Sequence, residues 1–399
     1  MPTSSFPYRP GLEGVVAAQT AISSVDGEKG ELVIRGFAVE DLAPHVTFED
    51  TVFLLWHDVL PDAEALNRFS GELAAHRQLE PHTLELLKAA AARRVPTMDA
   101  LRMACASLTG DVAGVPVAAR GPEAPRQEAL HLVAAFPVIV AAYHRLSQGL
   151  EPIAPRKELS HTANFFYMLH GREAPGTFVR ALDTYWNTIS DHGLNASTFT
   201  ARVIVSTGSD VVSAVTGAVG ALKGPLHGGA PGPALDLVFE IGSAEYAERV
   251  LREKLARGER LMGFGHRVYR TRDPRANVLG AAAENLFERA GDRQLYELAR
   301  AVEACALRLL REYKPARSLQ TNVEFHTALL LHGIKFPTPL FTPVFAAGRV
   351  AGWTAHCLEQ IASNRLFRPQ SVYIGARNGR PVPAAQRRRD SQKVSSDGS

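Results

Sequence analysis

Residues 222–232 read Leu-Lys-Gly-Pro-Leu-His-Gly-Gly-Ala-Pro-Gly and place one histidine, His227, among residues that do not suit the interior of a helix. Pro225 has no backbone donor, and the glycines on both sides of His227 allow backbone angles and close approaches that other residues do not. Backbone of this kind serves either a turn or a ligand. Taken alone, the stretch fits both an interdomain turn with an incidental histidine and a functional histidine.

Length and composition indicate an ordinary globular protein rather than a nucleic-acid-binding one. At 399 residues, with 46% hydrophobic and 21% charged residues, the chain is expected to fold into two domains. Beyond residue 376, six basic residues stand against two acidic ones, so this tail accounts for the formal net charge of +3 and the remainder is nearly neutral. We predict a disordered tail over 377–399 and no nucleic-acid partner.

Neither export nor membrane spanning is expected. The first ten residues contain no apolar run typical of a signal peptide, and the longest apolar region, 129–142, is short and contains a histidine and a proline. The three cysteines, Cys105, Cys305 and Cys357, stand far apart without paired spacing. This spacing indicates thiols in a reducing cytoplasm rather than disulfides or a zinc finger.

The remainder of the chain predicts an all-α fold with one early hairpin. Turn residues Asp26, Gly27 and Gly30 precede the strand-like run 32–34. After it, long helical patterns alternate with short glycine or proline breaks. The predicted helices span 48–59, capped by Thr47, then 63–77, 81–92, 97–109, 126–148, 159–170, 177–207, 244–257, 275–290, 294–312, 327–333 and 341–360.

The predicted helix 177–207 carries a second histidine. Apolar residues recur there at steps of three and four, and His192 falls on the same face, so it should point inward. Asn195 lies one turn further along. A hydrogen-bonded core histidine and a functional one both remain open at this point.

A third histidine begins an arginine-rich segment. Residues 263–275 read Gly-Phe-Gly-His-Arg-Val-Tyr-Arg-Thr-Arg-Asp-Pro-Arg, in which His266 is followed by four arginines, among them Arg270 and Arg275. Guanidinium groups bind phosphates and carboxylates through paired hydrogen bonds, so the segment suits an anionic ligand. A solvated loop is the alternative.

Two further charged residues stand among apolar neighbours. Glu324 precedes the predicted helix 327–333, and apolar surroundings would raise the pKa of its carboxyl towards that of a useful base. Arg349 lies within the apolar helix 341–360 and needs a partner there. A structural salt bridge is the simpler reading of Arg349.

Four motifs give the chain a close resemblance to the citrate synthase family over about 11–375. They are Asp-His-Gly-Leu-Asn-Ala-Ser-Thr at 191–198, Lys-Gly-Pro-Leu-His-Gly-Gly-Ala at 223–230, Gly-Phe-Gly-His-Arg-Val-Tyr at 263–269 with Asp-Pro-Arg at 273–275, and Asn-Val-Glu-Phe at 322–325. Each motif alone is weak. Together, in the family's order and spacing, they are highly specific.

The resemblance implies a cytoplasmic, all-α homodimer that condenses oxaloacetate with acetyl-CoA as cosubstrate, without a tightly bound cofactor. It implies a large domain over 1–228 and 336–376, a small domain inserted at 229–335, and a cleft between the two. The two active sites would be shared between subunits, with the glycine-rich boundary at 228–232 allowing domain closure.

The resemblance also implies roles for individual residues. His227 matches the donor to the thioester oxygen, His266 the group that polarises the oxaloacetate carbonyl, and Glu324 the base that removes the methyl proton. The remaining matches are ligands: His192, Arg275 and Arg349 for the oxaloacetate carboxylates, Arg368 for the same substrate from the neighbouring subunit, and Arg270 for the CoA phosphates.

The chain departs from the family pattern around the expected base. It has Glu324 where most members have aspartate, and His326-Thr327-Ala328 where they have Tyr-Ser-Gly. One more methylene moves a carboxylate by roughly an ångström, and a misplacement of that size can cost about a hundredfold in rate. Three consequences of the longer side chain are open: the backbone compensates for its length, the enzyme is slower, or the enzyme takes another acyl group.

Three alternatives remain open from the sequence. A 2-methylcitrate synthase would use propionyl-CoA, and one methyl group changes binding in an apolar pocket by only about 1–3 kcal/mol. A metal-dependent hydrolase could use His227, His266 and Glu324 as ligands, although the chain lacks a short-range ligand motif such as His-Glu-x-x-His. An inactive paralogue that only binds substrate is the third.

Overall fold

The computed structural model describes residues 8–108, 121–228, 231–265, 269, 271–290, 292–315 and 319–375. These residues fall into two units, which are treated separately: the body Thr20–Phe367, and the chain ends Met1–Gln19 with Arg368–Ser399. The predicted disordered tail, 377–399, lies outside the described residues.

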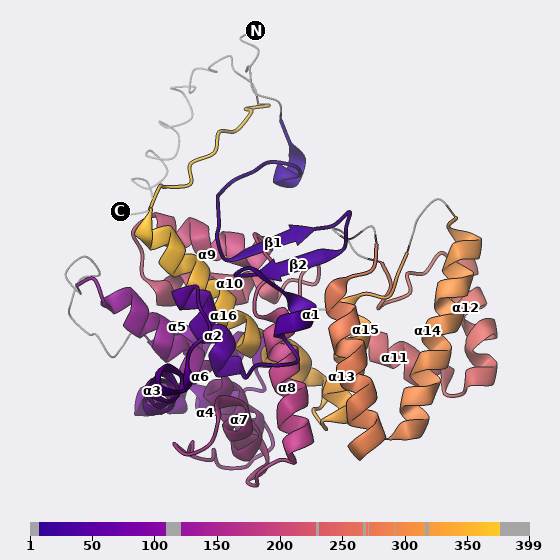
Figure 1. The fold of residues 1–399 in the computed structure, drawn as a ribbon, viewed down its shortest axis with the longest axis horizontal. Coiled ribbons are helices and arrows are strands. Elements are labelled where there is room, and N and C mark those ends of the chain that lie inside the picture. Colours follow the sequence, from indigo (N-terminus) through magenta and orange to yellow (C-terminus); the bar gives the residue numbers. More distant parts are fainter. Residues whose placement is uncertain are drawn as a thin grey trace, which may run out of the picture. The chain divides into compact units, whose positions relative to one another are not determined.

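The body is built from helices (Figure 1), as the sequence predicts. Its first half holds α1 Val39–Leu42, α2 Phe48–His57, α3 Ala63–Ala75, α4 Pro81–Ala92, α5 Thr97–Ser107, α6 Ala124–Ser147, α7 His161–His170 and α8 Gly176–Ile189. Its second half holds α9 Ala196–Ser206, α10 Val211–Leu222, α11 Pro231–Ile241, α12 Ala247–Ala256, α13 Pro274–Ala290, α14 Arg293–Tyr313, α15 Val323–Gly333 and α16 Phe341–Ala362. Short 3₁₀ turns lie at Pro10–Leu12, Ala244–Tyr246 and Thr338–Leu340.

The predicted hairpin is confirmed as part of a small antiparallel sheet. Strands β1 Ser23–Asp26, β2 Glu31–Ile34 and β3 Phe37–Ala38 pair in that order. The Asp26 carboxylate accepts hydrogen bonds from the backbone N–H groups of Glu28 and Lys29 at 3.1 and 3.0 Å. These bonds close the turn, in which Gly30 has φ 73°.

Helix starts follow the capping residues in the sequence. Thr47 caps α2 as predicted, and with Asp50 it forms a capping box in which each side chain accepts from the other residue's backbone N–H. Asp210 caps α10 by accepting from Ser213 N–H at 2.6 Å. The boundaries of α3, α4, α5, α7 and α14 lie within two residues of those predicted.

The predicted single helix over 177–207 is wrong. The chain forms α8 and α9 with a break at 190–195, and His192 lies in the break rather than on a helical face. Asn195 caps α9 by accepting from Thr198 N–H at 3.1 Å, and Gly193 has φ 57°. Apolar residues continue at steps of three and four across the break, so this spacing alone does not reveal where one helix ends and the next begins.

Three helices were not predicted: the four-residue α1, α10 and α11. Helix α10 is apolar on nearly all sides because it packs against α5, α6, α9 and α16, so it lacks the polar face that marks a surface helix. Helix α11 begins at Pro231, where the first turn needs no backbone donor. The irregular stretch around His227 is therefore shorter than expected at its carboxyl end.

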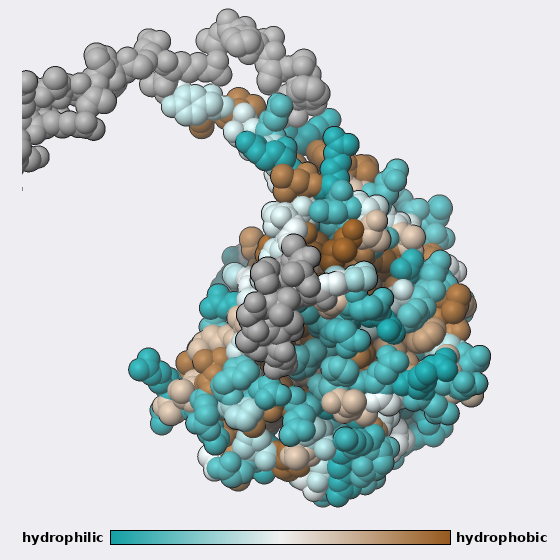
Figure 2. All heavy atoms as spheres, turned by 90° about the vertical axis from the view of Figure 1, so that its left-hand side faces the viewer, coloured by the Kyte–Doolittle hydropathy of each residue, from teal (hydrophilic) through white to brown (hydrophobic). Residues whose placement is uncertain are grey.

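Two long apolar helices, α6 and α16, pack against each other at the centre of the body. Helix α6 is long and apolar enough to cross a membrane, but 78% of that apolar window is buried against the rest of the chain. It packs against α4, α5, α7 and α16. The face in Figure 2 is mostly hydrophilic, with apolar residues scattered over it. Helix α6 is thus a core helix.

Helices α11–α15 gather at one side of the body (Figure 1). Within this group α13 packs against α15 and α14, and α13 also packs against α8 from the other side. Arg275 lies at the start of α13 and Glu324 at the start of α15. The arrangement therefore brings two predicted site residues to helix amino termini near the junction with α8 and α16.

Candidate active site

Glu324 is the second residue of α15, not a residue before the helix. Asn322 caps the helix, and its side chain accepts from the backbone N–H of Glu324 at 3.0 Å. Burial raises the pKa of the Glu324 carboxyl to about 7; the positive charges of Arg275 and Arg349 oppose this shift, and the charge of Asp273 adds to it. At neutral pH the group can both take up and release a proton.

The segment before Glu324 is bound to the segment that leads to His266. Gly265 N–H donates to Gln320 O at 2.7 Å, and Asn322 N–H donates to Gly263 O at 3.0 Å. The Asn322 side chain also donates to Gly265 O at 2.9 Å. His266 itself lies outside the described residues, as does Arg270.

His227 lies in a turn after α10. Its N–H donates to Gly224 O at 2.9 Å. A Cβ at Gly228 would meet Leu222 O at 2.4 Å, so the next residue must be glycine for the chain to turn here. This is the close approach that the sequence predicts, and it directs the His227 ring towards Ser197 in the first turn of α9.

The contacts of His227 define its protonation. The backbone N–H of Ser197, a fixed donor, faces Nε2 at 3.3 Å, and Ser197 Oγ lies 2.8 Å from the same atom. We therefore assign Nε2 as the acceptor and place the proton on Nδ1. Burial, helped by the charge of Arg349, lowers the pKa of His227 to about 4. The ring is neutral at pH 7 and offers one N–H.

Arg275 and Asp273 form a buried pair at the start of α13. The Arg275 Nε donates to Asp273 Oδ1 at 3.0 Å and its Nη2 to Oδ2 at 2.8 Å, while both side chains are almost fully buried. The guanidinium also lies 5.9 Å from the centre of the Tyr269 ring. The pair holds a fixed cation beside Glu324.

Arg349 projects from the middle of α16 into the same region. It is 2% exposed, its Nε donates to the carbonyl of Ile189, and its guanidinium carbon lies 4.7 Å from the centre of the Phe345 ring. Burial lowers the pKa of Arg349 to about 10, although Asp191 acts to raise it. No salt bridge of Arg349 to a described carboxylate was found, which disfavours the simpler reading of this residue.

His192 meets Tyr269 from the break between α8 and α9. Its Nε2 lies 3.0 Å from Tyr269 Oη, and the two rings meet edge to face. Since Tyr269 also contacts Arg275, His192 and Arg275 are connected through one aromatic ring. Arg368 belongs to the unit of the chain ends, where it is exposed and donates to Pro369 O at 3.0 Å.

Several residues that support the site were not predicted. Ser197 contacts His227 and accepts from Trp353 Nε1 at 3.0 Å; Asp273 pairs with Arg275. The signal for Asp273 is Asp-Pro directly before a helix, a common start sequence. Tyr185 is fully buried, and its hydroxyl lies in the field of Glu324, Arg349 and Arg275. No sequence signal marks it.

The arrangement combines a neutral histidine donor, a carboxyl group whose pKa is near neutrality, and two buried arginines, of which Arg275 pairs with Asp273 and Arg349 donates to a backbone carbonyl. Among the residues that the structure describes, no three His, Cys, Asp or Glu side chains come together as metal ligands. This combination of groups is suited to acid–base chemistry on an anionic substrate.

Comparison with known proteins gives the family. The model of the citrate synthase C-terminal domain matches residues 11–370. The citrate synthase of Acidithiobacillus ferridurans is 41% identical over 95% of this chain and 98% of its own length. The 2-methylcitrate synthase of Mycobacterium tuberculosis is 40% identical over 92% and 90%. The chain belongs to the citrate synthase family, and it is an acyltransferase.

A solved structure agrees with this assignment. The citrate synthase of Thermoplasma acidophilum, in a ternary complex with carboxymethyl coenzyme A and oxaloacetate, has a TM-score of 0.83 and 29% identity. The match covers 94% of this chain and 98% of that one. The predicted all-α citrate synthase fold is confirmed.

Proposed function

We propose that the protein condenses acetyl-CoA with oxaloacetate and hydrolyses the resulting thioester to citrate and CoA. The observation that carries the proposal is that Glu324, a carboxyl group with a pKa of about 7, and His227, a neutral donor, both lie in the field of the buried Arg349. A thioester methyl group is a very weak acid. Its proton leaves only when a base takes it while a donor stabilises the oxygen that becomes negative.

The roles follow from this chemistry. Glu324 removes the methyl proton, and His227 donates Nδ1–H to the thioester oxygen as the enol forms. His192, Arg275 and Arg349 hold the carboxylates of oxaloacetate through charge-assisted hydrogen bonds. His266 polarises the carbonyl that is attacked, and Arg270 contacts the CoA phosphates; these two roles rest on motif position alone.

The higher-order organisation is part of the proposal. The enzyme is a cytoplasmic homodimer without a tightly bound cofactor, in which Arg368 reaches the oxaloacetate site of the neighbouring subunit. Exposed apolar side chains in the unit of the chain ends support a subunit contact there, including Val16 at 89% and Ile374 at 95% exposure. The three cysteines form no disulfide. Residues 229–335 act as the small domain that closes on the substrates.

Propionyl-CoA is the second candidate substrate, because one relative of 40% identity is a 2-methylcitrate synthase. Thiol release from acetyl-CoA and from propionyl-CoA, each with and without oxaloacetate, tests both. We expect oxaloacetate-dependent release with acetyl-CoA, unchanged by EDTA. Oxaloacetate-dependent release with propionyl-CoA but not with acetyl-CoA would instead identify a 2-methylcitrate synthase. If neither acyl-CoA gave oxaloacetate-dependent thiol release, the proposed condensation would be contradicted.

The raised pKa of Glu324 predicts the pH dependence of the reaction. A base must be ionised to act, and with a pKa of about 7 only about a tenth of Glu324 is ionised at pH 6. We expect kcat/KM for oxaloacetate to fall about tenfold for each pH unit below 7 and to level off above it. A profile that stays flat from pH 5 to 8 would assign the base to another group.

A further inference from the structure

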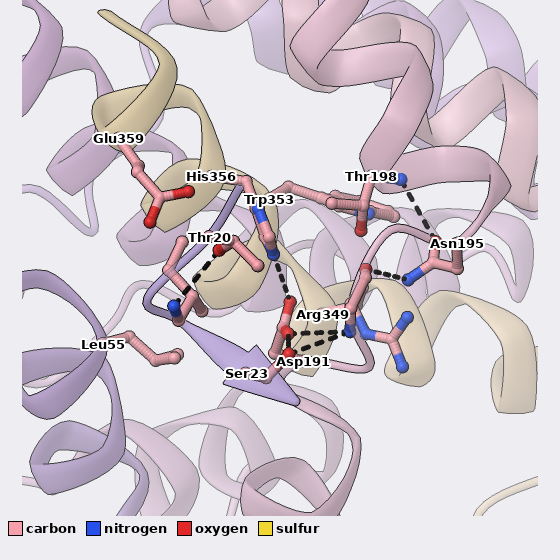
Figure 3. A network of polar contacts seen from close by, with 12 residues as sticks. Thr20, Ser23, Leu55, Asp191, Asn195, Thr198, Arg349, Trp353, His356 and Glu359 are labelled. Carbon is pink, nitrogen blue, oxygen red and sulfur yellow. Dashed lines mark hydrogen bonds and ion pairs between the residues drawn. The ribbon is translucent and has the colours of Figure 1, made fainter. Parts of the chain in front are cut away.

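One stripe of α16 contacts the start of the break between α8 and α9 and the helix ends on both sides of it. Arg349, Gly352, Trp353 and His356 follow at helical spacing on one side of α16. Arg349 donates to Ile189 O, and Trp353 donates to Ser197 Oγ. A Cβ at Gly352 would lie 2.2 Å from Ser190 O, so helix and loop are in direct backbone contact. Figure 3 shows the polar part of this arrangement.

His356, the last residue of the stripe, is fully buried between a cation and an anion. Its Nδ1 lies 2.9 Å from Arg202 Nη1, and its Nε2 lies 3.1 Å from Asp191 Oδ1. Arginine can only donate, so Nδ1 is the acceptor and the proton of the neutral ring is on Nε2. Arg202 is held in turn by Glu359, 2.6 Å away, and by Gln360. The ring therefore presents an N–H to Asp191.

Asp191 transmits this contact to the residue beside it in sequence, His192. The Asp191 carboxylate is fully buried; its Oδ2 accepts from Ser23 Oγ and from the backbone N–H of Gly193 at 3.0 Å. Its Oδ1 lies 3.1 Å from His356 Nε2, which points its N–H at this oxygen. The carboxylate thus holds, through a hydrogen bond, the peptide group that follows His192.

We propose that His356 is a positioning residue for oxaloacetate binding, which acts through Asp191 to fix the His192 loop. The inference rests on the proposed function, because it takes His192 as an oxaloacetate ligand. The acyl-CoA side of the site does not depend on this contact, since His227 is held by Ser197 instead. Loss of the contact between His356 and Asp191 should therefore weaken the binding of oxaloacetate and leave the binding of acetyl-CoA unchanged.

Two substitutions of His356 separate the contacts of its two nitrogens. In His356→Gln the amide can place an N–H near the position of Nε2 and so still reach Asp191. In His356→Asn the shorter amide can accept from Arg202 but cannot reach Asp191. We expect His356→Asn to raise KM for oxaloacetate about tenfold, as loss of a ligand's orienting partner does, with KM for acetyl-CoA unchanged. His356→Gln should remain close to the wild type.

The same substitution on another helix, His332→Asn on α15, is the matched control and should change neither KM. Ser23→Ala removes a different donor to Asp191 and provides a second variant that leaves the core intact; it should shift KM for oxaloacetate in the same direction by a smaller factor. Equal effects of His356→Asn on both substrates, or equal values for the Asn and Gln variants, would overturn the inference.

Calorimetric titration with oxaloacetate separates this inference from the proposed activity. If the wild type binds oxaloacetate but releases no thiol, the proposed condensation fails and the inference is still tested by the dissociation constants. The inference predicts a dissociation constant about tenfold larger for His356→Asn than for the wild type. Equal dissociation constants would contradict it whatever the turnover.

Discussion

Glu324→Gln is expected to lower kcat about a thousandfold while oxaloacetate still binds. The amide has nearly the same shape but cannot accept the methyl proton, and a positioned general base contributes about 10²–10⁴-fold. Arg275 and Arg349, the proposed oxaloacetate ligands, keep their own contacts with Asp273 and with the carbonyl of Ile189. Steady-state thiol release and oxaloacetate titration measure the two quantities.

Glu324→Asp is the control for the length of the side chain. If the backbone of α15 is placed for glutamate, the shorter aspartate should lose about a hundredfold in kcat, because roughly an ångström of misplacement costs that much. A faster Asp variant would mean that the glutamate is the misplaced group. Unchanged turnover in Glu324→Gln would show that the base lies elsewhere.

His227→Ala should have the second largest effect, a loss of about 10²–10³-fold in kcat. The ring is neutral because burial lowers its pKa to about 4, so in the proposed role it would stabilise the developing oxyanion by one N–H rather than by a full charge. Removal of one such donor costs this factor. The loss should fall on kcat more than on KM for acetyl-CoA, since the donor matters most when the oxygen is negative.

Ser197→Ala provides the control for the orientation of His227. It removes the hydroxyl 2.8 Å from Nε2 but keeps the backbone N–H that faces the same atom, so the tautomer should persist and the loss should be smaller. If His227→Ala and Ser197→Ala had equal effects, the histidine would be a structural residue rather than the oxyanion donor.

Local signals were sufficient for most of the fold. Thr47 with Asp50 set the start of α2, and Asp26 with Gly30 set the hairpin, because each depends on contacts between near neighbours. Of the helices that were missed, α1 is only four residues long, α10 depends on packing from all sides, and α11 begins with a proline in its first turn; none of these leaves a periodic pattern. The break at 190–195 was missed because the apolar spacing continues across it, and the cap formed there by Asn195 does not interrupt that spacing.

In the candidate site, too, some residues could be predicted from the sequence and others could not. Residues with an unusual sequence context, such as His227 between glycines or Arg349 among apolar residues, could be selected from the chain alone. Their partners could not, because they come from distant segments: Ser197, which contacts His227, lies on α9, and Ile189, which accepts from Arg349, ends α8. Glu324 was selected for its apolar neighbours, but its position inside α15 depends on the cap by Asn322.

Exchange of the methyl protons of acetyl-CoA in heavy water tests the central claim most directly. With malate in the oxaloacetate site there is no carbonyl to attack, so proton removal is observed without condensation. We predict deuterium incorporation by the wild type, detected by mass spectrometry, and none above background in Glu324→Gln or His227→Ala. Exchange by Glu324→Gln at the wild-type rate would contradict the claim that Glu324 and His227 together remove the proton.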